Sequence, residues 1–371
     1  MSAPPNAQSD LGWDLSPWFP ERSDDPTAAL MRSGDAALPF NPVLAASFFL
    51  TPRRPPALAE PFPVEPVPAA AAGQPLGRLE VGAILDKYRI EGLIGTGGFA
   101  TVYRAKHLLL DMTVAVKLLR PEVLQRRPGL AALLCEEARF AARINHPNVV
   151  RVFDVTHTPL ITYVVLEFIE GRSLASALSD CGRLSPREVL NIGMDIASGL
   201  QAGLDQGLIH RDIKPANVLL SAAGSAKIVD FGLAYRSRGR RSGASRSGST
   251  LQARSVLGTP GYVSPEQAVN PERVDFRADL YSLGATLYHA AVGRPPFPLD
   301  DVERCLSAHQ QEPVPLPTEI VPGFPAELAH LLLWFLAKPP GDRPGSYGVA
   351  LAAMGEVLTR LSSDGKESET R

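Results

Sequence analysis

Two short runs of mainly apolar residues lie within residues 208–232. A polar side chain suited to metal binding precedes the first run, and another follows the second. Residues 218–220 are apolar, and residues 226–229 are apolar except for Lys227. The short polar turn of small residues 221–225 between them predicts that the two runs pair as a β-hairpin. Because a hairpin brings its two ends together, Asn217 and Asp230 are expected to be neighbours. An amide oxygen beside a carboxylate suits Mg²⁺ that carries the phosphates of a nucleotide. Asp212, upstream of Asn217, would then accept a proton from the hydroxyl of a phosphate acceptor.

The order of the charged residues in this stretch resembles the catalytic loop, hairpin and metal-binding triad of the eukaryotic-type protein kinases. The matching residues are His210, Arg211, Asp212, Lys214, Asn217, Asp230, Phe231 and Gly232. The resemblance covers residues 88–361 and indicates a bacterial-like, soluble member of the serine/threonine class, since Lys214 follows Asp212 by two residues.

The resemblance implies a role for each residue of the loop. Asp212 would orient and deprotonate the substrate hydroxyl, and Lys214 would neutralise charge that grows on the transferred phosphoryl group. Asn217 and Asp230 would bind Mg²⁺, with Mn²⁺ as an alternative. His210 and Phe231 would be packing residues.

A lysine and a glutamate upstream complete the implied catalytic set. Residues 113–117 alternate along a strand, so Ala115 and Lys117 face the same side, where Lys117 would reach the α- and β-phosphates of ATP. Residues 130–144 have helical spacing and present two acidic side chains. By the family pattern Glu137 would pair with Lys117, and Glu136 is the alternative.

The resemblance also implies which residues contact ATP. A strand–turn–strand flap meets the pattern G-x-G-x-x-G-x-V at Gly95, Gly97 and Val102, but Ala100 stands where a third glycine is usual, which predicts a slightly stiffer flap. A buried strand over 161–168 resembles the hinge between two lobes. The implied contacts of flap, cleft, hinge and floor are Ile94, Gly95, Thr96, Gly97, Gly98, Phe99, Ala100, Thr101, Val102, Ala115, Lys117, Leu166, Glu167, Ile169, Lys214, Asn217, Leu219 and Asp230.

The implied fold is α+β and bilobal. An N-lobe over 81–167 would hold a small antiparallel β-sheet plus one helix, and a larger, mostly α-helical C-lobe would span 170–361. In the C-lobe, Ser185, Pro186 and Glu188 form a capping box that predicts the start of a helix. Residues 1–80 are rich in Pro and Ala, which predicts a disordered segment, and 362–371 are expected to be a polar, frayed tail.

Two long-range pairs are expected to hold the C-lobe together. Glu266 should pair with Arg343, and Asp279 should anchor the backbone of the catalytic loop, because a buried carboxylate is costly without partners. Thr259 would hydrogen-bond Asp212 and Lys214, a serine/threonine trait.

Residues 234–257 are rich in Arg, Ser and Gly with no acidic residue, a composition typical of a disordered, solvated loop. Because they lie between the motifs 230–232 and 264–266, residues 236–257 resemble an activation segment. Ser249, Thr250 and Ser255 are candidate autophosphorylation sites. A phosphate adds a charge of about −1.5 to −2 and would pair with Arg211. The arginine run could instead hold acidic substrates or another phosphoprotein.

Composition excludes several other classes. A net charge of −2 argues against a dedicated nucleic-acid binder. Cys135, Cys181 and Cys305 share no metal-ligand spacing, and no run approaches the roughly 20 apolar residues that span a bilayer. We therefore expect a cytoplasmic protein. The aromatic residues 12–19 are either a disordered patch or a docking motif for a partner or for the chain's own folded domain.

The sequence thus predicts an ATP-dependent kinase that moves the γ-phosphoryl group to protein Ser or Thr hydroxyls in signalling. Two other classes stay open at this stage. A pseudokinase scaffold usually lacks the lysine, the catalytic aspartate or the metal aspartate, whereas Lys117, Asp212 and Asp230 are all present. A small-molecule kinase should lack the segment 258–266 and its pairing with Arg343.

Overall fold

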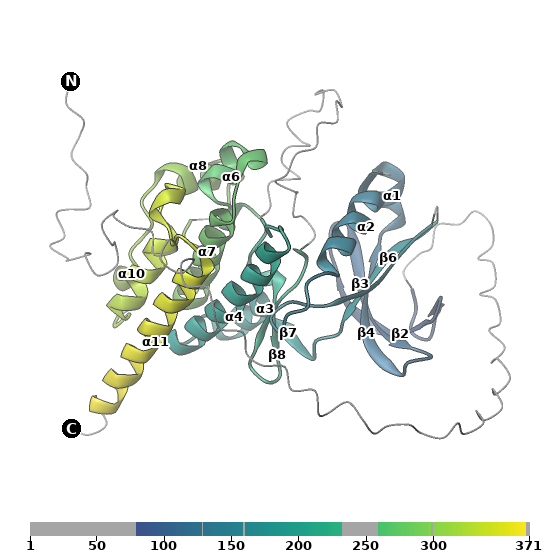
Figure 1. The fold of residues 1–371 in the computed structure, drawn as a ribbon, viewed down its shortest axis with the longest axis horizontal. Helices are drawn as coiled ribbons and strands as arrows, with labels where there is room; N and C mark the ends of the chain where they lie inside the picture. The colour runs from purple at the N-terminus through teal and green to yellow at the C-terminus, as the bar shows by residue number, and fades with distance from the viewer. Residues whose placement is uncertain (1–78, 128, 159, 232–258, 298–299, 369–371) are drawn as a thin grey trace, which may run out of the picture. The chain divides into compact units, whose positions relative to one another are not determined.

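The computed structural model describes residues 79–127, 129–158, 160–231, 259–297 and 300–368. They form two lobes, one built on a sheet and one on helices (Figure 1). The predictions made for residues 1–78 and for the segment 236–257 lie outside the described residues.

The first lobe is a six-stranded sheet in which every neighbouring pair of strands is antiparallel, as the sequence predicts. Order begins before Tyr88, because a short strand that the sequence did not reveal pairs with the strand starting there. The sheet order is β1-β2-β3-β4-β6-β5. The strands are β1 (Ile84–Leu85), β2 (Tyr88–Thr96), β3 (Ala100–His107), β4 (Met112–Leu119), β5 (Val152–His157) and β6 (Thr162–Glu167).

The two faces of this sheet differ in what they contact. One face carries the buried cluster that includes Tyr103, Val116 and Val165. The other face holds residues predicted to line the cleft, since directly opposed residues share a face. The register pairs Val102 with Lys117 and Ala115 with Leu166, and Ala115 and Lys117 are two residues apart on β4. The alternation in the sequence therefore predicts correctly that Ala115 and Lys117 share one face of the sheet.

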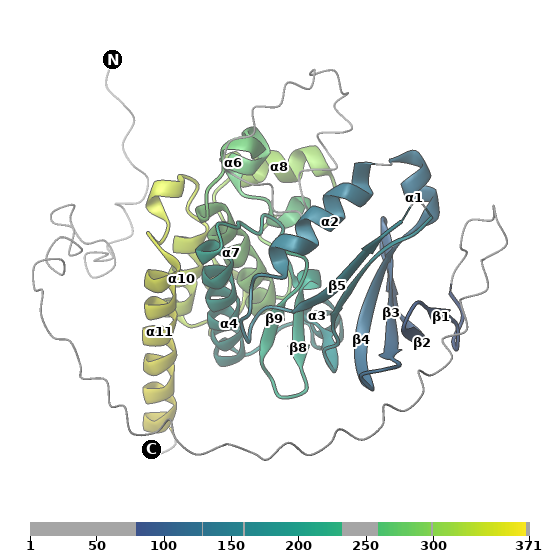
Figure 2. The ribbon, with the colours of Figure 1, turned by 45° about the vertical axis from the view of Figure 1, so that its right-hand side comes forward.

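Two helices accompany the sheet, where the sequence predicts one. α1 (Pro121–Arg126) is a single short helix before α2 (Gly129–Ala141), the predicted helix with the two glutamates. In Figure 2, α2 lies beside β5, and the two elements are in contact. Ala100 of β3 packs with Leu119 of β4 and Ala131 of α2 in a small buried cluster. The alanine that replaces a glycine of the flap pattern therefore serves the core.

The second lobe is built around two buried helices. α4 (Pro186–Asp205) starts with the predicted capping box, in which Ser185 Oγ accepts from Glu188 N at 3.3 Å and Glu188 Oε2 accepts from Ser185 N at 2.8 Å. α7 (Arg277–Val292) packs against α4 and is buried along almost its whole length. The remaining helices are α3 (Leu174–Cys181), α6 (Pro265–Val269), α8 (Val302–Gln311), α9 (Pro317–Ile320), α10 (Ala326–Phe335) and α11 (Tyr347–Ser368).

The C-terminal helix differs from the prediction. Instead of ending near 361 before a frayed tail, α11 continues through Ser368. Ser362 Oγ donates to Leu358 O at 2.8 Å and accepts from Arg187 of α4 at 2.8 Å. The Ser362 hydroxyl thus bonds both the preceding turn of α11 and the neighbouring helix α4.

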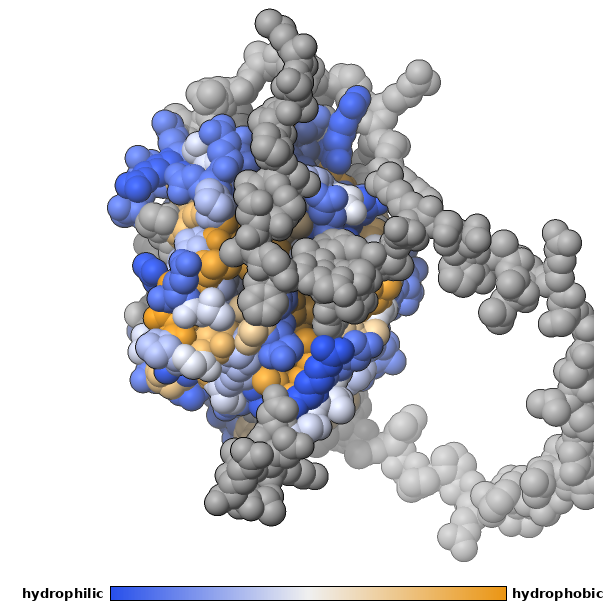
Figure 3. All heavy atoms as spheres, turned by 90° about the vertical axis from the view of Figure 1, so that its left-hand side faces the viewer, coloured by the Kyte–Doolittle hydropathy of each residue, from blue (hydrophilic) through white to orange (hydrophobic). Residues whose placement is uncertain are grey.

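The outside of the helical lobe is mixed in character. The face seen in Figure 3 has hydrophilic side chains at its borders and hydrophobic ones between them. No helix among the residues described is long and apolar enough to cross a membrane.

The predicted hairpin is present at the junction of the lobes. β8 (Val218–Ser221) pairs with β9 (Ala226–Ile228), and β7 (Gly171–Ser173), which the sequence did not reveal, adds a third antiparallel strand. Val229 N donates to Asn217 O at 3.0 Å, so the mouth of the hairpin is closed beside Asp230.

Both predicted long-range pairs are confirmed. Asp279 is 1% exposed and accepts hydrogen bonds from His210 N at 2.7 Å and Arg211 N at 2.6 Å. Arg343 Nη1 and Nη2 donate to the two carboxylate oxygens of Glu266 at 2.6 and 2.8 Å. Arg343 also donates to the carbonyls of three residues, Ala337, Arg277 and Lys338.

We predict that Arg343→Ala lowers the free energy of unfolding by about 3–5 kcal/mol, because it leaves a carboxylate and three carbonyls without their donor. Urea unfolding followed by circular dichroism measures this. As a control, Arg172→Ala removes an exposed pair with Asp180 and should cost less than about 1 kcal/mol. Equal losses in the two variants would contradict the prediction.

Candidate active site

Three residues, two from the predicted catalytic loop and one from the segment after it, surround the buried carboxylate of Asp212. Asp212 Oδ2 accepts from Lys214 Nζ at 2.7 Å and from Asn217 Nδ2 at 3.0 Å, and Asp212 Oδ1 accepts from Thr259 N at 3.4 Å. Lys214 Nζ also donates to Thr259 Oγ1 at 2.7 Å. The expected contacts of Thr259 with both residues are therefore present. A carboxylate held by donors in this way is poised to accept a further proton donor, such as a hydroxyl.

The Asn217 side chain is oriented for a cation. Its Nδ2 donates to Asp212 O at 2.8 Å as well as to Asp212 Oδ2, so the amide oxygen points away from these acceptors. The hairpin brings Asp230 to the same mouth. Two hard oxygen donors fit Mg²⁺, which usually takes one or two protein oxygens together with phosphate oxygens and waters. No cluster of three or more His, Cys, Asp or Glu in the described part of the chain offers an all-protein metal site.

Lys117 pairs with Asp230, not with the predicted partner. Lys117 Nζ lies 2.6 Å from Asp230 Oδ1, and the side chains are 23% and 36% exposed. Burial by itself would raise the pKa of Asp230, but the charge of Lys117 and its hydrogen bond outweigh burial and lower it. Asp230 has a positive φ of 60°, a conformation that non-glycine residues rarely adopt. The ion pair therefore joins the first lobe to a strained residue at the mouth of the hairpin.

Glu137 faces this pair without forming the predicted ion pair with Lys117. Burial raises the pKa of Glu137 to about 8, and the charge of Lys117 opposes the shift only in part. The physical reason is that the Lys117 ammonium is already compensated by Asp230 at contact distance. Of the two glutamates, Glu136 is exposed and Glu137 is half-buried, so the choice of Glu137 as the inward-facing residue agrees with the structure.

The predicted flap has the expected strand–turn–strand form. Gly95 pairs with Val102 and Thr96 with Thr101, and Gly97 N donates to Ala100 O at 2.8 Å to close the turn. The other flap residues named from the sequence are exposed at its tip or edge: Ile94, Gly98 and Phe99. A Cβ at Gly95 or Gly98 would meet nothing within 4 Å, so the backbone there is open to a close approach by a ligand.

The predicted hinge makes contacts that the sequence did not reveal. Glu167 ends β6, and its carboxylate accepts from Lys227 Nζ of β9 at 2.8 Å and from Arg151 N at 3.2 Å. Glu167 N donates to Arg151 O at 2.9 Å. Leu166, Glu167 and Ile169 are all half-buried, and Leu219 of β8 is likewise half-buried. The hinge is thus tied to the hairpin that lies between Asn217 and Asp230, the two predicted metal ligands.

Three residues pack against the predicted catalytic loop or brace its backbone. The His210 ring lies 4.9 Å from the Phe231 ring, edge to face, and His210 Nε2 is 3.0 Å from Val229 O. Both rings are buried, in accord with the packing role expected for them. Gln267 was not anticipated. Its Nε2 donates to Arg211 O at 2.9 Å, and the only signal in the sequence is the capping-box spacing from Ser264.

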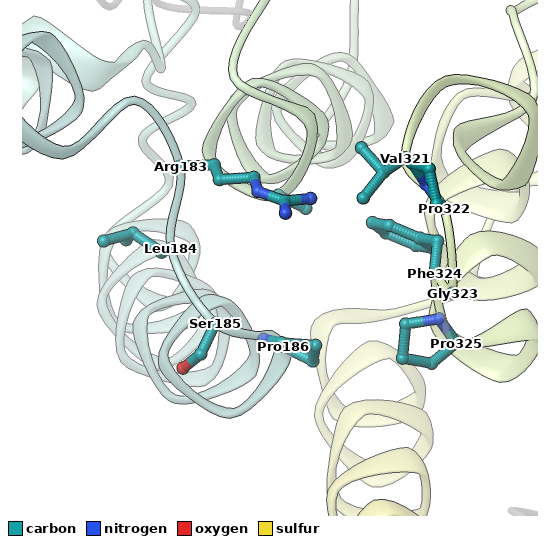
Figure 4. Close-up of a pocket in the computed structure, with 10 residues that line it drawn as sticks. Arg183, Leu184, Ser185, Pro186, Val321, Pro322, Gly323, Phe324 and Pro325 are labelled. Atoms are coloured by element: carbon teal, nitrogen blue, oxygen red, sulfur yellow. The ribbon is translucent and has the colours of Figure 1, made fainter.

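A cavity of about 300 Å³ lies elsewhere in the helical lobe. Figure 4 shows Arg183 extending toward Val321 and Phe324 across it, with Ser185, Pro186 and Pro325 on its lower side. None of the residues predicted to act in catalysis lines this cavity. The convergence of charged groups, and not the cavity, therefore marks the candidate site.

Comparison with known proteins agrees with this geometry. The family model described as a protein kinase domain matches residues 88–354. The serine/threonine-protein kinase PknB of Mycobacterium tuberculosis is 36% identical over 263 residues, 70% of this chain and 41% of that protein. PknH of Mycobacterium bovis is 34% identical over 284 residues, 76% of this chain and 46% of that protein. The crystal structure of the Mycobacterium tuberculosis PknI kinase domain has a TM-score of 0.58 at 26% identity, covering 75% of this chain and 99% of that chain.

The chain thus spans less than half the length of the curated relatives it matches. The match still covers most of the chain and includes both lobes and the predicted catalytic loop. On this basis the chain belongs to the protein kinase family, with the bilobal fold of its bacterial serine/threonine members.

Proposed function

We propose that this chain is an ATP-dependent serine/threonine protein kinase that acts in signalling. The observation that carries the proposal is the triangle of Asp212, Lys214 and Thr259, with separations of 2.7 Å for both contacts of Lys214 Nζ. A carboxylate, an ammonium and a threonine hydroxyl held together in this way suit the alignment of an aliphatic hydroxyl next to a phosphoryl group. Asn217 and Asp230 stand beside the triangle as candidate Mg²⁺ ligands.

In the proposed mechanism the side chains of this chain orient the reactants and manage the proton. Asp212 accepts the proton of the attacking Ser or Thr hydroxyl, whose oxygen forms a bond to the γ-phosphorus of ATP while the bond to the bridging oxygen of ADP breaks. Lys214 offsets the negative charge on the transferred group. Mg²⁺, when bound through Asn217 and Asp230, would neutralise phosphate charge. Lys117 would contact the α- and β-phosphates, with Glu137 as its partner once Asp230 binds the metal.

The substrates and regulation follow as parts of the same proposal. Protein substrates with Ser or Thr acceptors are favoured because Thr259 belongs to the segment 259–266 that Glu266 and Arg343 lock in place. Autophosphorylation within 236–257 and docking through the N-terminal segment stay predictions. A cytoplasmic location, where ATP is available, is also a prediction. The alternative of a noncatalytic scaffold requires that these charged groups do not support turnover.

We predict that Asp212→Asn lowers phosphate transfer from radiolabelled ATP to a generic protein substrate by about 10²–10⁴-fold, because the amide cannot accept the proton. Phosphoamino-acid analysis should find label on Ser or Thr. As a matched control, Asp205→Asn changes an exposed aspartate at the end of α4 and should leave transfer unchanged. A wild-type chain that transfers no label under several activating conditions would support the scaffold instead.

We also predict a pH effect from Glu137. Because the pKa of Glu137 rises from 4.5 to about 8 on folding, the folded chain binds more protons than the unfolded chain between these values. The free energy of unfolding should therefore fall as pH rises through this window. Glu137→Gln removes this contribution and should flatten the fall between pH 5 and pH 8 by about 1–3 kcal/mol, since one pKa unit corresponds to about 1.4 kcal/mol.

Urea unfolding at several pH values measures this slope. Glu136→Gln, the same change at the exposed neighbouring residue, is the matched control and should retain the wild-type slope. If the Glu137→Gln chain showed the wild-type slope, its carboxyl group would not be the one held in the protonated form.

A further inference from the structure

One face of α4 runs along the strand that leads to Asp230. Asp195, Gly199 and Gly203 are spaced four residues apart on this helix, so they lie on the same face. Asp195 Oδ2 accepts from Ala226 N, the first residue of β9, at 2.7 Å. The other two residues of the face are glycines in the interior of a helix, where each costs about 1 kcal/mol relative to alanine. This loss of helix stability would be offset if neighbouring residues pack too closely against the helix to leave room for a Cβ.

The contacts of the glycines show this close packing. A Cβ at Gly199 would lie 2.9 Å from Asn148 O and 3.0 Å from the Ile228 side chain, closer than ordinary van der Waals contact. A Cβ at Gly203 would overlap the Phe231 ring, with Cζ at 2.8 Å. The ring cannot easily retreat, because Phe231 is 4% exposed and its ring centroid lies 4.9 Å from that of the His210 ring. The helix surface is thus hollowed at the two places where this segment of chain lies against it.

The three contacts follow one another along both partners. Asp195 accepts a hydrogen bond from the backbone of Ala226. Gly199 leaves room for the Ile228 side chain, and Gly203 leaves room for the Phe231 ring. Asp230 stands between the last two contacts and has a positive φ of 60°. A strained backbone of this kind persists only where its neighbours are held firmly. The seating of Ile228 and Phe231 on α4 provides that hold on each side of Asp230.

We propose that Asp195, Gly199 and Gly203 form a positioning track on α4, and that Gly203, by seating Phe231, sets where the Asp230 carboxylate lies. Gly203 is a positioning residue for phosphoryl transfer and touches no substrate. The inference rests on the proposed assignment of Asp230 to Mg²⁺. It predicts that a single methyl group added to α4 alters the response of the enzyme to the metal.

The test is Gly203→Ala in the full chain, assayed with ATP and a generic protein substrate over a range of Mg²⁺ concentrations. A misplacement of about 1 Å at a reacting centre can lower a rate about 100-fold. We expect kcat to fall about 10- to 100-fold and the Mg²⁺ concentration for half-maximal rate to rise several-fold. Phe231→Leu in the same chain shortens the apolar side chain and should restore both values at least in part.

The control is Gly193→Ala, the same change on the same helix away from the track. A Cβ there would meet the tips of Leu287 and Met354 at 2.8 Å, so the variant should melt at a lower temperature with an unchanged Mg²⁺ requirement. The proposal is overturned if Gly203→Ala keeps the wild-type Mg²⁺ requirement, or if adding Phe231→Leu restores nothing. Should Gly203→Ala fail to fold, recovery of the folded state in the double variant supports the contact, and no recovery overturns it.

Asp230→Asn separates this inference from the assignment on which it rests. Loss of transfer in Asp230→Asn together with a normal Gly203→Ala variant would remove the positioning role alone. Retained transfer in Asp230→Asn would remove both the metal assignment and the inference.

Discussion

The catalytic loop depends on one buried carboxylate that belongs to another element. Asp279 of α7 accepts the backbone N–H groups of His210 and Arg211, and Tyr347 of α11 lies 3.5 Å from the same carboxylate. Burial raises the pKa of Asp279 even though these donors oppose the shift. Because an unpaired carboxylate in this interior would be costly, the loop backbone and α7 hold each other. Arg211 at this point has a positive φ of 67°, which the two hydrogen bonds help to maintain.

From this anchor the charges of the site form two paired groups. On the helical lobe, Lys214 is compensated by Asp212. Across the junction, Lys117 of β4 is compensated by Asp230, beyond the end of β9. The hinge adds a third pair of Glu167 and Lys227, which ties β6 to β9. Two of these pairs, Lys117 with Asp230 and Glu167 with Lys227, join segments distant in sequence, so the fold brings these opposite charges together. Catalysis by positioning and electrostatics requires such an arrangement.

Much of the fold and the candidate site could be predicted from local patterns. The hairpin, the capping box at Ser185 and the shared face of Ala115 and Lys117 on β4 each follow from spacing within a few residues, and the structure has all three. The resemblance to a family extended this to Glu266 with Arg343 and Asp279 with the loop. Elements without strong local signals were not foreseen: the two-residue β1, the three-residue β7 and the short α1.

The sequence by itself determined which residue types could do chemistry and where strands and helices would carry them, since periodicity and capping act over short distances. Only the tertiary structure decided how these groups pair. Lys117 lies against Asp230 and not Glu137, and the glycines of α4 face Ile228 and Phe231. The physical reason is that the partner of a side chain depends on how whole elements pack. A choice between two carboxylates near one ammonium turns on distances of a few ångströms, which no local pattern encodes.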